Sequence, residues 1–234
     1  MNDEEKRQAR EIRAYELASL RIVELHADPI RGNFDARHFK AIHAYIFQDT
    51  PQYRPGITRK DAPNWTKHRA LEGRRDRYDV PYVSRGVAAR IRRILAHFGG
   101  PQALQGQTLD AAAARLARLY GDLDHAHGFH EGNSRTLREF FRELAQEAGF
   151  ALDWTGTGVT AKERDELYVA RDLAVTESEF PGLTQERAMQ TADRREYESF
   201  FSQEQLRAAA GARTLEAIIR EGLSTSLATA PARP

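Results

Sequence analysis

Residues 127–138 read HGFHEGNSRTLR, and no other stretch of this length in the chain gathers so many chemically capable side chains. It contains an imidazole at His127, a carboxylate at Glu131 and guanidinium groups at Arg135 and Arg138. A glycine between the acid and the arginines is typical of a turn that leads into a helix. A functional site is therefore expected in this loop and in the first turn of the helix after it.

The helix is predicted from the spacing of apolar residues. From Ser134 onward these residues share one helical face, at Leu137, Phe140, Phe141, Leu144 and Ala148. Asn133 or Ser134 is expected to be the N-cap, and Gly149 stands where a C′ glycine ends a helix. The first N–H groups of a helix lack internal partners and carry a partial positive charge, so an anion site is expected at its start.

The side chains around this helix start suit a nucleotide phosphate. Gly132 lets the backbone approach a ligand closely, and Arg135 offers a planar donor fork that matches phosphate. Arg138 follows three residues later on the same side of the helix. Glu131 is a hard oxygen ligand for Mg²⁺ on a polyphosphate, and His127 lies within a loop's reach as a general base.

A histidine metal site is the alternative interpretation of the same loop, because His125, His127 and His130 form an H-x-H-x-x-H pattern. Zinc sites need three or four ligands that converge on one point. The two nearby arginines would repel a dication, so the nucleotide interpretation is favoured.

The string also resembles the motif of the Fic family, which is written H-P-F-x-(D/E)-G-N-G-R-x-x-R. Seven positions match in register: His127, Phe129, Glu131, Gly132, Asn133, Arg135 and Arg138. Gly128 stands where the family has proline, and Ser134 stands where it has the second glycine. Neither exchange removes a reactive group, so the resemblance implies an active protein.

The resemblance implies a protein adenylyltransferase, or AMPylator, that transfers AMP from Mg²⁺-bound ATP to a side-chain hydroxyl of a target protein. In that role His127 is the catalytic base and Glu131 binds Mg²⁺. The nucleotide-binding residues are then Gly132, Asn133, Ser134, Arg135 and Arg138. A bacterial toxin or effector is the expected type.

Two other functions are considered. The first is a kinase, or a transferase of another phosphate-containing group, on the same fold. Kinase-like relatives carry lysine at the position of Ser134, which argues against it. The second is a non-catalytic helical interaction module, against which the intact His127, Glu131 and Arg135 argue.

Composition limits the remaining function classes. The formal net charge is +1 and cysteine is absent, which excludes disulfides and cysteine-based sites. No apolar run approaches the ~20 residues that span a membrane. Neither nucleic acid nor a membrane is expected as a partner. A cytoplasmic location is expected, with delivery into a host cell if the protein is an effector.

The expected fold is all-α: a Fic-type helical bundle with one small β-hairpin, the flap, around residues 56–82. Proline and glycine interrupt this region. The expected organisation is an N-terminal helical extension at 1–29, a Fic domain at 30–200, and a C-terminal helix with a disordered tail at 201–234. Helical patterns cover 4–26, 84–98 after a Ser84 cap, 108–126, 160–178, 184–210 and 213–223; another follows Asn33 or Asp35 as its cap.

Two protein partners follow from the resemblance. A target protein is expected to dock at the flap by strand addition. Residues 51–100 hold twelve lysines and arginines against four acids, which indicates either a solvated surface or an arm over the polyphosphate that engages a partner. Four flap residues, Trp65, Lys67, His68 and Arg69, are candidates for contacts with the base or the target.

The second partner is a small antitoxin protein. Many Fic proteins are restrained by a helix with the pattern (S/T)-x-x-x-E-(G/N), whose glutamate pairs with the second motif arginine. Here Ala217-x-x-x-Glu221-Gly222 fits except at its first position. Glu221 is therefore interpreted as an ordinary surface residue. If the chain has no inhibitory helix of its own, we expect a separate antitoxin to inhibit the protein.

Overall fold

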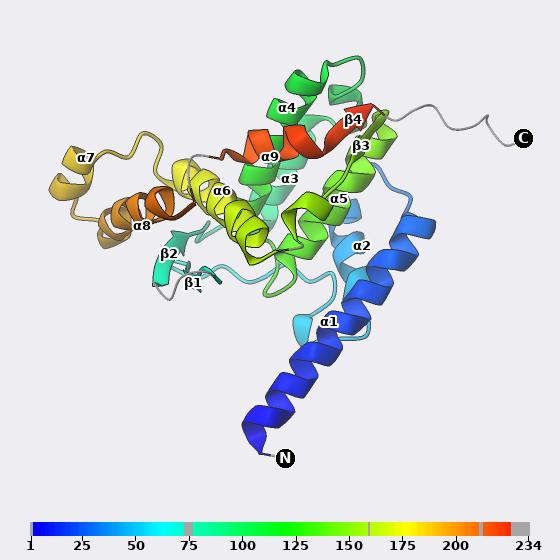
Figure 1. The fold of residues 1–234 in the computed structure, drawn as a ribbon, viewed down its shortest axis with the longest axis horizontal. Coiled ribbons are helices and arrows are strands. Elements are labelled where there is room, and N and C mark those ends of the chain that lie inside the picture. The colour runs from blue at the N-terminus through cyan, green and yellow to red at the C-terminus, as the bar shows by residue number, and fades with distance from the viewer. Residues whose placement is uncertain (1, 73–76, 159, 211–212, 226–234) are drawn as a thin grey trace, which may run out of the picture.

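The structure is a computed structural model that describes residues 2–72, 77–158, 160–210 and 213–225. Most of this described part is helical, and the central helices α4 (Leu109–Ala126) and α5 (Asn133–Glu147) pack against each other (Figure 1). The all-α expectation is thereby confirmed. None of the helices described is both long enough and apolar enough to cross a membrane.

The other helices and strands, in chain order, are α1 (Asp3–Ala27), α2 (Ala36–Ile46), β1 (Thr66–Ala70), β2 (Arg77–Pro81), α3 (Val87–Phe98), β3 (Phe150–Leu152), α6 (Ala161–Glu179), α7 (Gln185–Gln190), α8 (Arg194–Ala210), α9 (Leu215–Gly222) and β4 (Leu223–Thr225). Short 3₁₀ turns cover Pro51–Tyr53, Pro101–Ala103 and Thr155–Thr157.

Several predicted helix ends are confirmed by their caps. The Asp35 side chain accepts hydrogen bonds from the N–H groups of Arg37 and His38, which fixes the start of α2. Thr160 and Glu163 form the expected capping box of α6. Gly149 follows the end of α5 with a φ of +90°.

Three other predicted boundaries are wrong. α3 starts after Gly86, not after Ser84, because the Ser84 hydroxyl accepts the Trp65 N–H instead. α5 has Gly132 as its N-cap, so Asn133 already lies in the first turn. The stretch expected as one helix over 184–210 is divided into α7 and α8 by residues 191–193.

The predicted hairpin is present. β1 and β2 pair antiparallel, with Lys67 opposite Val80. Tyr78, Val80 and Tyr82 form a small core with residues of α6 and α8, separate from the main core. The hairpin is therefore seated on α6 and α8, and the Asp79 N–H donates to the Ser202 hydroxyl of α8.

A second two-stranded ladder was not predicted. β3 follows α5 and pairs antiparallel with β4, with Ala151 opposite Ser224. It joins the C-terminal segment to the end of the motif helix, while α9 packs against α4. The expected domain limits stay a prediction. The expected limit between residues 200 and 201 falls inside α8. Residues 226–234 of the expected tail lie outside the described residues.

The junction between α9 and β4 leaves no room for a side chain at Gly222, where a Cβ would lie 2.3 Å from the carbonyl oxygen of Asp153. We expect Gly222→Ala to destabilise the protein by about 1–3 kcal/mol through overpacking, read as a lower midpoint of urea unfolding. Gly156→Ala is the matched control, because nothing lies within 4 Å of that added Cβ. Equal midpoints for the two variants would contradict the β3–β4 ladder.

Candidate active site

Two residues with left-handed backbone enclose the motif loop. His127 is the C-cap of α4 with a φ of +45°, and Gly132 precedes α5 with a φ of +78°. A histidine in this conformation is strained, and such strain is held only where the surroundings fix it. The loop thereby turns His127 toward the start of α5, and the residue is 2% exposed.

Arg59, which precedes the hairpin, holds the loop from outside. Its Nε donates to the His127 carbonyl oxygen at 2.6 Å, and its Nη2 donates to the carbonyls of Ala126 and Val83. The guanidinium lies 4.7 Å from the centre of the Trp65 ring. Burial lowers the pKa of Arg59 to about 10, so the side chain remains a cation at neutral pH. One buried arginine thus joins the segment before the hairpin to the end of α4.

Asn133 closes the loop from inside and fixes the tautomer of His127. Its Oδ1 accepts the Phe129 N–H at 2.9 Å, so the other side-chain atom is the amide nitrogen. That nitrogen donates to the Phe129 carbonyl at 2.7 Å and lies 3.2 Å from Nε2 of His127. The imidazole Nε2 is therefore the acceptor, with its lone pair toward the start of α5, and Nδ1 carries the hydrogen.

Tyr82 and a group of cations complete the surroundings of His127. The Tyr82 ring centre lies 4.2 Å from the imidazole centre. Burial lowers the pKa of His127 well below 6.5, and the charges of Lys67, Arg69, Arg59 and Arg171 lower it further. The imidazole is thus a neutral base at pH 7, in surroundings that favour anions.

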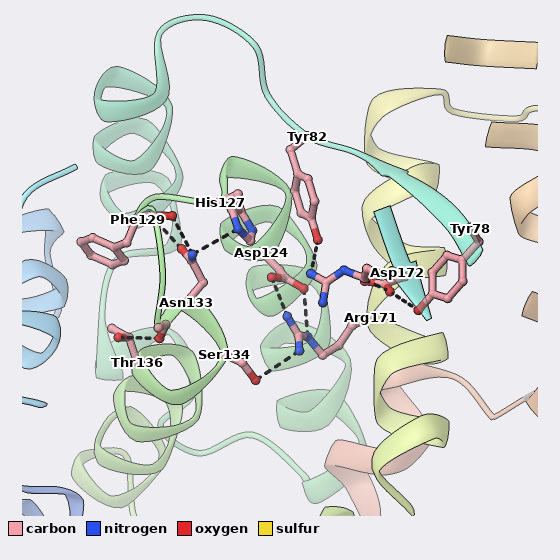
Figure 2. A network of polar contacts seen from close by, with 12 residues as sticks. Tyr78, Tyr82, Asp124, His127, Phe129, Asn133, Ser134, Thr136, Arg171 and Asp172 are labelled. Atoms are coloured by element: carbon pink, nitrogen blue, oxygen red, sulfur yellow. Dashed lines mark hydrogen bonds and ion pairs between the residues drawn. The ribbon is translucent and has the colours of Figure 1, made fainter. Parts of the chain in front are cut away.

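Ser134, the departure from the family glycine, has a dedicated partner. Arg171 of α6 is buried and donates to both Asp124 carboxylate oxygens, at 2.8 and 2.9 Å, and to the Ser134 hydroxyl at 3.1 Å (Figure 2). Asp124 lies on the last turn of α4, three residues before His127. The network therefore fixes the end of α4, the start of α5 and α6 relative to one another.

The same network reaches the hairpin. Asp172, next to Arg171, accepts a hydrogen bond from the Tyr78 hydroxyl at 2.8 Å (Figure 2). Its carboxylate lies 3.5 Å from Nε of Arg69. Arg69 also donates to the Tyr82 hydroxyl. Burial raises the pKa of Asp172. A movement of β1 would therefore displace the Tyr82 ring, which packs on His127.

Arg135 lines an open cleft of about 720 Å³, together with Glu131 and Tyr53. Its guanidinium lies 4.7 Å from the centre of the Phe47 ring, and Nη1 is buried without a hydrogen-bond partner. The same ring packs on the helix start, since a Cβ at Gly132 would lie 2.2 Å from Phe47 Cε2. A guanidinium with a nitrogen that no described residue bonds, beside a helix N-terminus, is suited to a ligand's phosphate.

Glu131 is exposed, and its Oε1 accepts the Gly132 N–H at 3.2 Å. His43 fixes its backbone: Nδ1 accepts the Gly56 N–H, so Nε2 donates to the Glu131 carbonyl at 3.1 Å. Burial lowers the pKa of His43 to about 4, which keeps it neutral. Its ring stacks on Phe129 at 3.7 Å.

The side chains around the motif loop that could ligate a metal fit an Mg²⁺ ion carried by a substrate, and they do not fit a metal held by the protein alone. No group of three or more histidine, cysteine, aspartate or glutamate side chains in the described ranges could hold a metal alone. The three motif histidines do not converge, since His125 pairs with Glu179 at 2.7 Å and His127 faces Asn133. A single exposed carboxylate suits Mg²⁺ that is held mainly by a substrate polyphosphate.

The comparison with protein families identifies the domain. The model of the Fic/DOC family matches residues 33–145, which include the motif loop. Residues 33–145 belong to the Fic/DOC family. The other comparisons agree with this assignment.

Two curated relatives are protein adenylyltransferases by name. The protein adenylyltransferase VbhT of Bartonella schoenbuchensis is 33% identical over 142 residues, which are 58% of this chain and 26% of that protein. The probable protein adenylyltransferase Fic of Salmonella typhimurium is 26% identical over 169 residues, 71% of this chain and 77% of that protein. The chain thus spans about a quarter of the length of VbhT.

The fold is shared with solved structures. The N-terminal Fic domain of a Bartonella quintana effector, solved with bound ADP, superposes with a TM-score of 0.62 at 20% identity. The match covers 93% of this chain and 86% of that one. At this identity the likeness concerns the fold, and it confirms the expected Fic-type helical bundle.

The Fic motif accounts for some residues of the site and not for others. His127, Gly132, Asn133, Arg135 and Glu131 lie together as predicted, and Arg138 is half-buried with its carbonyl bound to the Trp154 indole N–H. Arg59, Tyr82, Asp124 and Arg171 were missed, because each is remote from the motif in sequence or carries no pattern of its own. Of the flap candidates, Lys67 and Arg69 lie beside the site, whereas His68 is exposed and pairs with Asp79.

Glu221 does not act as an inhibitory glutamate in this structure. Its carboxylate pairs with Arg213, and its side chain is 70% exposed. Arg138, the arginine that such a glutamate would meet, has no ion pair with it in the described part of the chain. The interpretation of Glu221 as a surface residue therefore agrees with its position.

The buried Asp124–Arg171 pair gives a prediction about the stability of the protein. We expect Arg171→Met to destabilise it by about 3–5 kcal/mol, because the Asp124 carboxylate stays buried without its cation. The double variant Asp124→Leu/Arg171→Met should regain most of that loss, since no charge is then left unpaired. Urea unfolding of the single and double variants measures both. A double variant no more stable than Arg171→Met would show that the charge pair is not the source of the loss.

Proposed function

We propose that this protein is a protein adenylyltransferase that transfers AMP from ATP, with Mg²⁺, to a side-chain hydroxyl of a target protein. The observation that carries the proposal is the neutral His127 imidazole, whose Nε2 lone pair faces the N-terminus of α5. The names of the curated relatives support it.

The base is His127. The target hydroxyl takes the position of the Asn133 amide at Nε2 and gives its proton to that nitrogen as its oxygen attacks the α-phosphorus. Pyrophosphate leaves, and AMP becomes attached to the hydroxyl oxygen. The surrounding cations disfavour the imidazolium, so the proton is readily lost and the base is restored.

The start of α5 holds the phosphates. The free N–H groups after Gly132 face the developing negative charge, and Arg135 reaches the outer phosphates from its stack on Phe47. Asn133 and Ser134 belong to this first turn, and Arg138 supports it from the next turn. Positioning and charge neutralisation account for most of phosphoryl-group catalysis, and this turn supplies both.

Glu131 would hold Mg²⁺ on the polyphosphate, where the ion neutralises phosphate charge. Its backbone is fixed by the hydrogen bond from His43, while its exposed carboxylate accepts the Gly132 N–H through Oε1 at the edge of the cleft. The Lys67 ammonium of β1 is attracted by the Glu131 carboxylate and helps to lower the pKa of His127, so the hairpin adds a cation above the same site.

The target would add a strand to β1. The outer side of β2 is occupied, since the Asp79 N–H donates to Ser202 of α8. In the part of the chain that the structure describes, β1 pairs with β2 alone, so its outer edge can receive an extended segment. A small antitoxin protein remains the proposed regulator, and a toxin or effector the proposed type.

Transfer is tested by incubating the protein with Mg²⁺, cell lysate and ATP labelled on either the α- or the γ-phosphate. We expect protein-bound label from the α-phosphate only, and a loss of about 10²–10⁴-fold in His127→Ala, the range for a general base. His130→Ala is the matched control, because the half-buried His130 side chain has no hydrogen bond or ion pair with another described residue, and this variant should keep the activity. Protein-bound label from the γ-phosphate would contradict this proposal and would indicate that the protein is a kinase.

The pH dependence follows from the lowered pKa of His127. Because the imidazole stays unprotonated down to a pH below 6.5, we expect kcat/KM to be level from about pH 8 to 6.5 and to fall only at lower pH. Lys67→Met removes one of the cations that lower this pKa, so the acid limb should move to higher pH. An acid limb centred above pH 6.5 in the unchanged protein would contradict the environment described for His127.

A further inference from the structure

A second concave surface lies on the outside of α3 and α4, away from the residues assigned to nucleotide binding. It is a groove of about 540 Å³ between the two helices. Its floor is apolar and consists of Ile94, Phe98 and Leu119. Ile94 and Phe98 are half-buried, so apolar surface remains accessible in the groove.

Four arginines surround this floor: Arg90, Arg93, Arg115 and Arg118. The last three are exposed, and Nε of Arg90 is buried without a hydrogen-bond partner. Asp122 is the only acid that lines the groove, and no ion pair joins it or any other described carboxylate to these arginines. The groove therefore carries a strong local excess of positive charge in a chain whose formal net charge is +1.

This arrangement is unfavourable for the isolated helices. Arg90 and Arg93, like Arg115 and Arg118, are three residues apart and are therefore neighbours on the helix surface, where like charges repel. Helices elsewhere in the fold have arginines paired with carboxylates, as Arg142 is with Glu139 and Arg194 with Glu198. An unpaired cluster over an apolar floor is the pattern of a surface that receives an anionic partner.

We propose that this groove, named the α3–α4 groove, is a docking site for an acidic amphipathic helix of a protein partner. Two antiparallel helices with an apolar floor receive a third helix along its apolar face. Carboxylates on the two edges of that face would meet the arginines of α3 on one side and those of α4 on the other.

Other anionic partners fit the groove less well. Nucleic acid phosphates would meet the arginines but would leave the apolar floor uncovered. A membrane surface is flat, and the apolar side chains here lie below the arginines instead of projecting beyond them. Only a ligand with an apolar face and acidic flanks satisfies both the floor and the rim.

The test uses a fluorescein-labelled peptide of about 18 residues, five helical turns, with leucines at helical spacing on one face and glutamates beside them. Binding is measured by fluorescence anisotropy without nucleotide, so it does not depend on the proposed transferase activity. We expect saturable binding, and binding at least about tenfold weaker to Arg93→Glu/Arg118→Glu. A scrambled peptide of the same composition should bind at least about tenfold more weakly to the unchanged protein.

The matched control is Arg37→Glu/Arg92→Glu, which makes the same change of net charge at exposed arginines outside the groove. It should bind the acidic peptide like the unchanged protein. A charge-swapped peptide, with lysines in place of the glutamates, should bind Arg93→Glu/Arg118→Glu better than it binds the unchanged protein. Circular dichroism of each variant verifies that it remains folded.

Several results would overturn the proposal. These are the absence of saturable binding, equal binding of the scrambled peptide, and equal weakening by the control double variant. Tighter binding of single-stranded RNA, or of phosphatidylserine vesicles, would assign the groove to that class of partner instead.

Discussion

The side-chain amide of Asn133 is the contact on which the rest of the site depends. One planar group accepts the Phe129 N–H and donates to the Phe129 carbonyl and to His127. The two hydrogen bonds with Phe129 hold the loop, and the contact with His127, whose place the target hydroxyl takes, identifies Nε2 as the acceptor nitrogen. The fold around it, from α4 through the loop to α5, holds the amide and the imidazole in register.

The cations around this loop all act on His127 in the same direction, adding to the effect of burial on its pKa. Lys67, Arg69, Arg59 and Arg171 all keep the imidazole neutral, and the same charges would attract a polyphosphate. Burying cations is unfavourable unless they are paired, and the structure pairs the three arginines with groups that serve the fold. Arg171 has Asp124, Arg69 has Asp172, and Arg59 has three backbone carbonyls. The stability of the domain and the chemistry of the site thus rest on the same side chains.

The sequence alone predicted the parts of the site that lie in one continuous motif, because a helix start and its loop are specified locally. His127, Glu131 and the residues of the first turn of α5 therefore came together as expected. The hairpin was placed correctly from its chain position, yet its contacts with α6 and α8 could not be predicted, since they join residues about 100 positions apart. The cap of α5 was wrong because an asparagine that looks like an N-cap closes the loop instead. Arg171 shows the same limit: nothing in its own neighbourhood points to Ser134.

The left-handed backbone at His127 affects how a chemically inert form of the domain is best made. Asparagine tolerates this conformation better than most residues, whereas alanine there would retain the strain without the contacts that oppose it. Under the proposed function, an asparagine at this position would give up proton abstraction while keeping the loop shape that the proposed target protein would meet. The His127→Asn variant would then bind the proposed target protein without modifying it, and could be used to trap that complex.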